Sequence, residues 1–162
     1  MECFFAENFD KTSEIIALNI EESRHTKSLR ITLNDEILVT NGNGLTALCK
    51  LAEISKNGNK CEIIEFYDNL NELSAEITLA VGITENSDRY EFIIEKATEL
   101  GVKEIVPLIT RYSTVRQIRY ERLVSKSIAA LKQSKRSILP VITQPVRFED
   151  IADNLDLWDT IV

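Results

Sequence analysis

The spacing of apolar positions changes character about halfway along the chain. Before residue 68, short runs of alternating apolar and polar residues are separated by tight polar turns. From residue 75 on, strand-like apolar runs are interleaved with stretches in which apolar residues recur at helical spacing. Alternation is typical of half-buried strands, and a period of about 3.6 is typical of amphipathic helices. We therefore expect a β-rich first part and an α/β second part.

The first part is predicted to form a small β-barrel, because several short strands joined by tight turns favour that architecture. One short helix is expected at residues 20–30, with Asn19 as its N-cap. Asn-Gly steps at 41–44 and 57–59 favour hairpin turns, because primed turns need residues that tolerate a positive φ. The expected strands are residues 2–6, 14–18, 35–40, 45–54 and 60–67.

Residues 75–109 have the pattern of a strand, a helix and a second strand. An apolar run rich in β-branched residues opens the segment. Asp88 and Glu91 are then spaced as in a capping box, and Gly101 stands where a left-handed residue would end the helix. A second apolar run follows at 104–109. This order predicts two parallel strands joined by a right-handed crossover.

After a loop at 111–116, a helix is predicted at 117–135, and its helical wheel separates two faces. The face expected to point outward as a basic stripe contains Arg119, Arg122, Lys126, Gln133 and Arg136. The face expected to pack on the sheet contains Tyr120, Val124, Ile128 and Leu131.

The rest of the chain is expected to add a third strand at 139–143, a short helix at 148–154 and the start of a strand at 158–162. An α/β sheet needs helices on both faces, and no helix follows this last strand, so we expect the chain to be incomplete. The polar residues 68–74 mark the predicted boundary. The two expected domains are residues 1–70 and 75–162.

Composition excludes several classes of protein. No apolar run is long enough for a membrane span, and the first residues do not have the pattern of a signal peptide. The three cysteines, Cys3, Cys49 and Cys61, form no CxxC pair, which favours buried thiols in a cytoplasmic protein over disulfides or a metal site. His25 is the only histidine, which argues against a Ser-His or Cys-His hydrolase.

Charge is unevenly distributed along the chain. The whole chain has a formal net charge of −7. Residues 111–136 nevertheless contain eight Lys and Arg residues and a single acid, Glu121. Such a basic segment produces a local field that attracts phosphate-bearing ligands. The segment is therefore the predicted electrostatic footprint for RNA.

Several motifs in order resemble one family. They are His25 with Leu29-Arg30, Asp35, Asp88-Arg89, EKATELG at 95–101, Pro107, Arg111 with Ser113, Gln133-Ser134-Lys135-Arg136 and Pro140. In this order and spacing they resemble the bacterial 16S ribosomal RNA uracil-N3 methyltransferases of the SPOUT superfamily. The resemblance covers essentially the whole chain, and KATELG followed by QSxR is its most specific part.

This resemblance implies a fold and an activity. It implies a PUA-like β-barrel followed by a SPOUT-type parallel α/β domain, and a homodimer that uses S-adenosylmethionine to methylate N3 of a uridine in 16S ribosomal RNA. The trefoil-knot segments of such proteins lie beyond residue 162. We therefore expect a chain truncated before the knot, inactive alone, with no cofactor-binding residue of its own and no metal.

Candidate site residues follow from the chemistry that methylation of uracil N3 requires. Arginines can stabilise the uracil anion, and an amide can orient it. The catalytic candidates are Arg111, Gln133 and Arg136. The RNA-binding candidates are His25, Arg30, Arg116, Arg119, Arg122 and Lys126. Arg136 can also be a cation at a helix C-terminus, and His25 a packed side chain. Lys96 and Glu99 are expected to form a surface ion pair.

Two other functions are considered. The chain can be an RNA-binding module without catalysis, whose RNA affinity would not depend on a methyl donor. A nucleotide-binding enzyme of the doubly wound type is disfavoured, because the turn after the first strand of the second part reads TENSD and contains no glycine for a pyrophosphate to approach.

Overall fold

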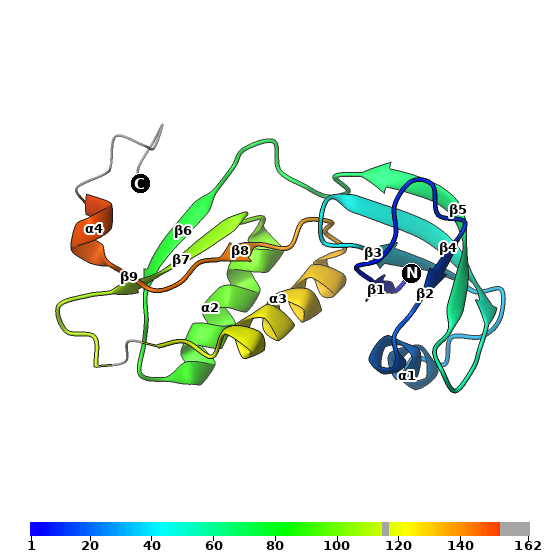
Figure 1. Cartoon of the computed structure of the whole chain (residues 1–162), viewed down its shortest axis with the longest axis horizontal. Helices are drawn as coiled ribbons and strands as arrows, with labels where there is room; N and C mark the ends of the chain where they lie inside the picture. The colour runs from blue at the N-terminus through cyan, green and yellow to red at the C-terminus, as the bar shows by residue number, and fades with distance from the viewer. Residues whose placement is uncertain (115–116, 153–162) are drawn as a thin grey trace. The chain divides into compact units, whose positions relative to one another are not determined.

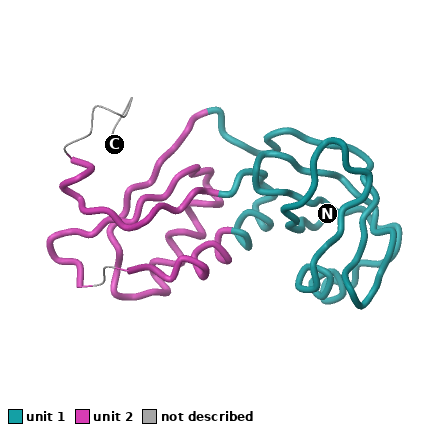
Figure 2. Tube along the Cα trace, viewed as in Figure 1, with its two compact units in different colours: residues 1–74, 128–139 teal, residues 75–127, 140–162 magenta. Residues whose placement is uncertain are grey.

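The computed structural model describes residues 1–114 and 117–152 of the chain. These residues divide into two compact units, residues 1–74 with 128–139, and residues 75–127 with the chain from 140 on (Figure 2). Residues 128–139, which the sequence analysis assigned to the second domain, thus cluster with the first part. The predicted division into domains at residues 1–70 and 75–162 stays a prediction.

Residues 1–74 of the first unit form a curled five-stranded sheet with one helix, α1 (Ile20–Ser28) (Figure 1). Its strands are β1 (Cys3–Phe5), β2 (Ile15–Ala17), β3 (Glu36–Thr40), β4 (Leu45–Glu53) and β5 (Lys60–Asp68). They lie in the order β1-β3-β4-β5-β2, with β1 parallel to β3 and all other pairs antiparallel. The five strands and the helix predicted for this part are confirmed.

Local sequence accounts for the turns and the helix start. The side chain of Asn19 accepts a hydrogen bond from the backbone N–H of Glu22 at 2.8 Å, as an N-cap does. Gly58, in the turn between β4 and β5, has a φ of +127°, and a Cβ there would lie 2.6 Å from the carbonyl oxygen of Leu18. Only glycine fits this position without a backbone shift.

One core fills the inside of the curled sheet. Its fully buried side chains include Phe4, Ile16, Ile37, Val39 and Leu51. The three cysteines are buried and unbridged, as predicted. Burial raises the pKa of each thiol from the ordinary 9.0 to about 12. They are therefore packing residues rather than nucleophiles.

The segment after α3 (Tyr120–Ser134) adds a short extended piece to the first unit. Gly44 donates its backbone N–H to the carbonyl of Ser137 at 2.8 Å, and Leu139 donates to the carbonyl of Gly42 at 2.8 Å. Both partners lie in the β3–β4 turn. These bonds explain why residues 128–139 cluster with the first unit.

The second unit is a parallel sheet built around one central strand, β7 (Glu104–Ile109). Strands β6 (Thr78–Gly82), β8 (Val141–Ile142) and β9 (Val146–Arg147) all pair with it in parallel. The predicted crossover, with α2 (Ser87–Leu100) between β6 and β7, is confirmed (Figure 1). Strand β9 was not predicted, and the expected strand at 158–162 lies outside the described residues.

Helix α2 and the first turns of α3 pack on this sheet. The shared core contains Ile94 and Ala97 of α2, Leu123 of α3, Ile105 of β7 and Ile142 of β8. A short helix, α4 (Phe148–Ala152), follows β9 and agrees with the prediction as far as residue 152. In the described part of the chain, no helix has both the length and the apolar composition to cross a bilayer.

The start of α2 differs from the prediction. Asn86 is its N-cap and accepts a hydrogen bond from the backbone N–H of Arg89 at 3.1 Å, so the predicted capping box of Asp88 and Glu91 is wrong. Asn and Asp cap helices about equally well, and the sequence offers both within three residues. The predicted helix end is confirmed, because Gly101 has a φ of +100°.

Pro107 lies inside the central strand, where a residue without an N–H would normally break the hydrogen-bond ladder. Thr143 donates to the carbonyl of Ile105, so Ile105 and every second residue after it face β8 and β9. Strand β8 pairs only with Glu104 and Ile105, and β9 pairs from Leu108 on. Pro107 therefore faces the gap between them, where no donor is needed.

Candidate functional site

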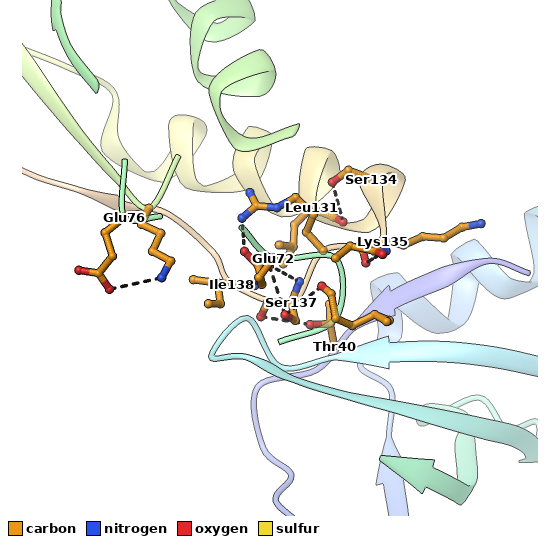
Figure 3. A network of polar contacts seen from close by, with 12 residues as sticks. Thr40, Glu72, Glu76, Leu131, Ser134, Lys135, Ser137 and Ile138 are labelled. Atoms are coloured by element: carbon orange, nitrogen blue, oxygen red, sulfur yellow. Dashed lines mark hydrogen bonds and ion pairs between the residues drawn. The ribbon is translucent and has the colours of Figure 1, made fainter. Parts of the chain in front are cut away.

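The end of α3 is held by a buried polar network in the first unit (Figure 3). Lys135 has a φ of +54°, and the N–H of Arg136 closes on the carbonyl of Leu131 at 3.1 Å, which is the Schellman arrangement. Asn71 donates its side-chain N–H to the carbonyl of Lys135 at 2.9 Å. The chain thus turns sharply after the helix without a glycine at the turn.

Glu72 is the centre of this network. Its carboxylate forms an ion pair with Arg136, and both side chains are 3% exposed. It also accepts hydrogen bonds from the backbone N–H groups of Ser137 and Ile138, both at 2.8 Å. The prediction that Arg136 belongs to an outward basic stripe is therefore wrong. The helical wheel failed there because α3 ends at Ser134 and the chain turns inward.

A second buried ion pair lies in the same unit. The ammonium of Lys132 is 2.5 Å from a carboxylate oxygen of Glu22, with side chains 16% and 7% exposed. Glu22 belongs to α1, so this pair ties α1 to α3. Two of the eight cations of the basic segment are thus paired internally, which reduces the charge that the segment presents to solvent.

In the second unit, basic residues of α3 meet a buried acid of α2. Glu91 is 5% exposed and accepts from the Nε of Arg122, and the ammonium of Lys126 lies 3.8 Å from its other oxygen. The hydrogen bond to Glu91 raises the pKa of Arg122. Arg119 has no ion pair among the described residues and is exposed. Of these three candidates, Arg119 is the one left to meet an external phosphate.

Other expectations for α3 need correction as well. The helix begins at Tyr120 rather than at residue 117. Tyr120 was expected on the packed face, but it is 44% exposed. The buried positions within the helix are Leu123, Ser127, Ala130 and Leu131. The late start leaves Arg119 in the preceding segment rather than in the stripe.

A cavity of about 250 Å³ lies at the carboxyl end of β6, in the second unit. Its walls come from the turn after β6, the first turns of α2 and the chain leading into α3, and include Ile83, Tyr90, Gln117, Ile118 and Leu123. Ligands of parallel α/β sheets typically bind at this edge. This cavity was not predicted from the sequence, because its walls come from three separate segments.

The structure places the remaining candidates at separate points. Arg111 is exposed, with its guanidinium 5.7 Å from the centre of the Tyr112 ring, and Gln133 is exposed on α3. His25 is exposed, but its ring packs edge-on against Phe4 with centroids 5.6 Å apart. Arg116 lies outside the described residues. The expected pair of Lys96 and Glu99 is confirmed at 2.8 Å.

Arg30 has a backbone role in addition to its charge. Its φ is +59°, and the N–H of Ile31 closes on the carbonyl of Thr26 at 3.0 Å, so Arg30 occupies the left-handed position that ends α1. Its side chain is exposed. The residue therefore presents a cation to solvent from a fixed backbone position.

Three important residues were missed by sequence reasoning. They are Glu72, which was expected in the boundary segment, Glu91, which was expected in a helix cap, and Tyr90, which was given no role. The one signal in the sequence that could have identified Glu72 and Glu91 is that acids can form ion pairs with the cations of a predicted basic helix. Among the described residues, no cluster of three or more His, Cys, Asp or Glu side chains could hold a metal ion.

Two family models match the chain in order. Residues 18–64 match an RNA methyltransferase PUA domain, and residues 71–162 match an RNA methyltransferase domain. The second match alone covers more than half of the chain.

Curated relatives match most of the chain. It is 34% identical over 122 residues to the ribosomal RNA small subunit methyltransferase E of Rickettsia conorii, a match that takes in 75% of this chain and 49% of the relative. It is 30% identical over 158 residues to the protein of the same name from Aquifex aeolicus. This match takes in 93% of this chain and 66% of the relative. The chain therefore spans between about half and two-thirds of the length of these relatives.

Solved structures of RNA methyltransferases also resemble this chain over most of its length. A ribosomal RNA small subunit methyltransferase E from Neisseria gonorrhoeae, bound to S-adenosyl methionine, is 27% identical with a TM-score of 0.82 and matches 94% of this chain and 65% of that one. A probable rRNA-methyltransferase from Porphyromonas gingivalis is 25% identical with a TM-score of 0.81. That match takes in 99% of this chain and 65% of the other. The predicted fold class, a PUA-like barrel followed by a SPOUT-type parallel α/β domain, is confirmed.

Proposed function

Because the chain belongs to the RNA methyltransferase family, we propose that it takes part in transferring a methyl group from S-adenosylmethionine to N3 of a uridine in 16S ribosomal RNA. The observation that carries this proposal is the order of the two matches, a PUA domain followed by an RNA methyltransferase domain. A PUA-type barrel followed by a methyltransferase sheet suits a substrate that is RNA.

The chemistry needs a positioned uracil anion. N3 of uracil is a weak acid, so its proton must leave as the methyl group approaches, and the negative charge then spreads to the carbonyl oxygens. Fixed cations and hydrogen-bond donors stabilise that charge. Arg111 and Gln133 are exposed and can reach a substrate. The buried pairing of Arg136 with Glu72 supports a positioning role for Arg136 at the end of α3.

S-adenosylmethionine supplies the methyl group when it is bound. The cavity at β6 is smaller than the roughly 300–1,000 Å³ pockets that enclose ligands of that size. The turn beside it, residues 83–87, contains no glycine. These residues do not fit the donor, so we expect its site mainly in a part of the protein outside this sequence.

RNA contact is proposed for both units. In the first unit Arg30 and His25 are exposed, and in the second Arg119 is exposed and has no ion pair in the described part of the chain. Arg116, Arg122 and Lys126 complete the proposed set. Cations of this kind position the phosphate backbone rather than read bases. We also propose a homodimer in the cytoplasm, with the small ribosomal subunit or its RNA as partner.

The test compares this chain with a full-length relative. The Aquifex aeolicus relative and the 162-residue chain are each titrated with S-adenosylmethionine in a calorimeter and then incubated with labelled donor and 16S ribosomal RNA. We expect donor binding and 3-methyluridine from the relative, and RNA binding without donor binding from this chain. Donor binding by the chain would overturn the proposed location of the donor site. Methylation of another atom would overturn the proposed product.

A second candidate is an RNA-binding module without catalysis, and the match of residues 18–64 to a PUA domain favours it. It predicts RNA affinity that S-adenosylmethionine does not change, even when the chain is extended to the length of its relatives. Donor-dependent RNA binding by the extended protein would exclude it.

A further inference from the structure

The cavity at the carboxyl end of β6 is lined by both apolar and polar residues. Ile83 and Leu123 are 8% and 3% exposed, and with Ile118 they form its apolar side. Gln117 and Arg119, both exposed, lie at its opening. A site with apolar walls and a few convergent polar groups is the usual form of a small-ligand site.

Tyr90 is the unusual residue in this lining. The residue is 4% exposed, and its hydroxyl is buried without a hydrogen-bond partner among the described residues. A buried hydroxyl without a partner costs free energy, and most such groups in proteins are satisfied. Phenylalanine would fill the same space without that cost. A hydroxyl at this position is therefore explained if a ligand supplies the partner.

The charges around the cavity argue for a neutral ligand. Glu85 and Glu91 line it together with Arg119, and Glu91 is already paired with Arg122. Two carboxylates would repel an anion placed inside the cavity. A single exposed guanidinium at the opening suits a phosphate that stays outside. The cavity thus fits an uncharged, hydrogen-bonding group that is attached to a phosphate.

We propose that this cavity binds one unpaired nucleobase of RNA, with its faces against Ile83, Ile118 and Leu123 and its polar edge on the Tyr90 hydroxyl and the Gln117 amide. Arg119 then holds the phosphate of the same nucleotide. The proposal rests on the proposed function, since an RNA substrate supplies the base. Single-stranded RNA is commonly recognised by unstacked bases held in this manner.

The volume is consistent with this ligand. At about 250 Å³, the cavity is below the range that encloses drug-sized molecules, so it suits one nucleoside rather than a dinucleotide. The hydroxyl of Tyr90 acts as donor or acceptor and an amide offers both, so these two groups can match a base edge that alternates acceptors and donors.

The test is an NMR titration of the 162-residue chain with uridine, uridine monophosphate and inorganic phosphate, without methyl donor. Uridine should shift signals of residues 83–91 and 117–123, and inorganic phosphate should not. Tyr90→Phe should weaken uridine binding roughly threefold to tenfold, the worth of one hydrogen bond. Its unfolding midpoint should stay unchanged or rise, because a buried unpartnered hydroxyl is removed.

Tyr67→Phe is the matched control, because that hydroxyl is in the first unit and donates to Glu65 at 2.7 Å. It should leave uridine binding unchanged. Equal binding by wild type and Tyr90→Phe, or shifts confined to other residues, would overturn the proposal. Arg119→Ala should weaken uridine monophosphate binding more than uridine binding, and an equal loss would overturn the role given to Arg119.

The outcome is separable from that of the proposed function. Nucleoside binding is measured without donor and without methyl transfer. If the Aquifex aeolicus relative methylates RNA while this chain binds no nucleoside, the cavity proposal fails alone. If uridine binds here but the relative forms no 3-methyluridine, the proposed reaction fails and the cavity remains a base-binding site.

Discussion

Glu72 and Arg136 form an ion pair in which each side chain is only 3% exposed. Glu72 stands in the polar stretch after β5, and Arg136 stands two residues after α3. The same carboxylate accepts the backbone N–H groups of Ser137 and Ile138. One acid therefore determines how the chain leaves α3, and so where the exposed end of that helix, with Gln133, is held.

Removing this acid should be costly. Glu72→Ala removes the buried carboxylate that pairs with Arg136 and accepts two backbone N–H groups, and the expected loss is about 3–5 kcal/mol of unfolding free energy. Glu72→Gln keeps an acceptor for the N–H groups and should lose less. Denaturant unfolding of the two variants measures both values.

The control for this variant is Asp68→Asn, four residues earlier. Asp68 pairs with Lys11 at 2.7 Å, but the side chains are 64% and 61% exposed. Exposed pairs contribute roughly 0–1 kcal/mol, so this change should be nearly silent. Comparable losses from Glu72→Ala and Asp68→Asn would contradict the importance given to the buried pair.

Arg119 and Arg122 should differ in their effect on RNA binding. Arg122 is engaged by Glu91, whereas Arg119 has no ion pair in the described part of the chain. Arg119→Ala should reduce the slope of log affinity against log salt by about 1, the contribution of one phosphate contact. Arg122→Ala should change it less. Filter binding of single-stranded RNA over a salt series gives the slope for each variant. Identical slopes for Arg119→Ala and Arg122→Ala would mean that the ion pair with Glu91 does not keep Arg122 from contacting RNA.

Arg30→Gly should separate the backbone role of Arg30 from its charge. Its φ of +59° suits glycine better than arginine, so stability should be unchanged or rise by about 0.5–1 kcal/mol. RNA affinity should fall, because the cation is lost. Arg30→Lys, which keeps the charge, should bind RNA nearly as well as the wild type. A less stable Arg30→Gly variant would show that the side chain has packing contacts that matter.

Alkaline pH should destabilise the first unit. Burial raises the pKa of Cys49 and Cys61 from 9.0 to about 12, so the unfolded chain loses these protons first. The stability that each protonated thiol gives the folded state is complete below the pKa of the thiol in the unfolded chain. It is lost as the pH rises through the pKa of the thiol in the folded chain. Each thiol then contributes a fall of about 1.4 kcal/mol per pH unit within that window.

The measurement is chemical unfolding between about pH 8 and pH 11, followed by circular dichroism. Cys49→Ala removes one of these thiols, so its unfolding free energy should fall less steeply with pH than that of the wild type. If the unfolding free energies of Cys49→Ala and the wild type fell with pH at the same rate, the thiol would ionise equally in the folded and unfolded states.

Local sequence sufficed for most elements. Asn19 and Gly101 are residues whose short-range chemistry determines a helix end, and the apolar runs of β6 and β7 leave little alternative to buried strands. Errors came where two neighbours were equally suited, as with Asn86 and Asp88 at the start of α2. Strand β9 was missed because Val146–Arg147 is too short to show a period.

Site residues were predicted less well, and the reason is physical. The charge of Arg136 and Arg122 is visible in the sequence, but their partners Glu72 and Glu91 are distant or lie on another helix. Whether a cation faces solvent depends on those partners, and a helical wheel shows only the residues of its own helix. For Arg111, Gln133 and the RNA-binding candidates, their roles stay predictions.

The sequence by itself determined the order and kind of the elements, the hairpin turns and the parallel crossover, because each depends on residues close together in the chain. Only the tertiary structure decided that residues 128–139 join the first unit, that Arg136 is buried and that Tyr90 lines a cavity, its hydroxyl unpartnered among the described residues. Those features depend on which distant groups share a buried space, where an unpaired charge or hydroxyl is costly.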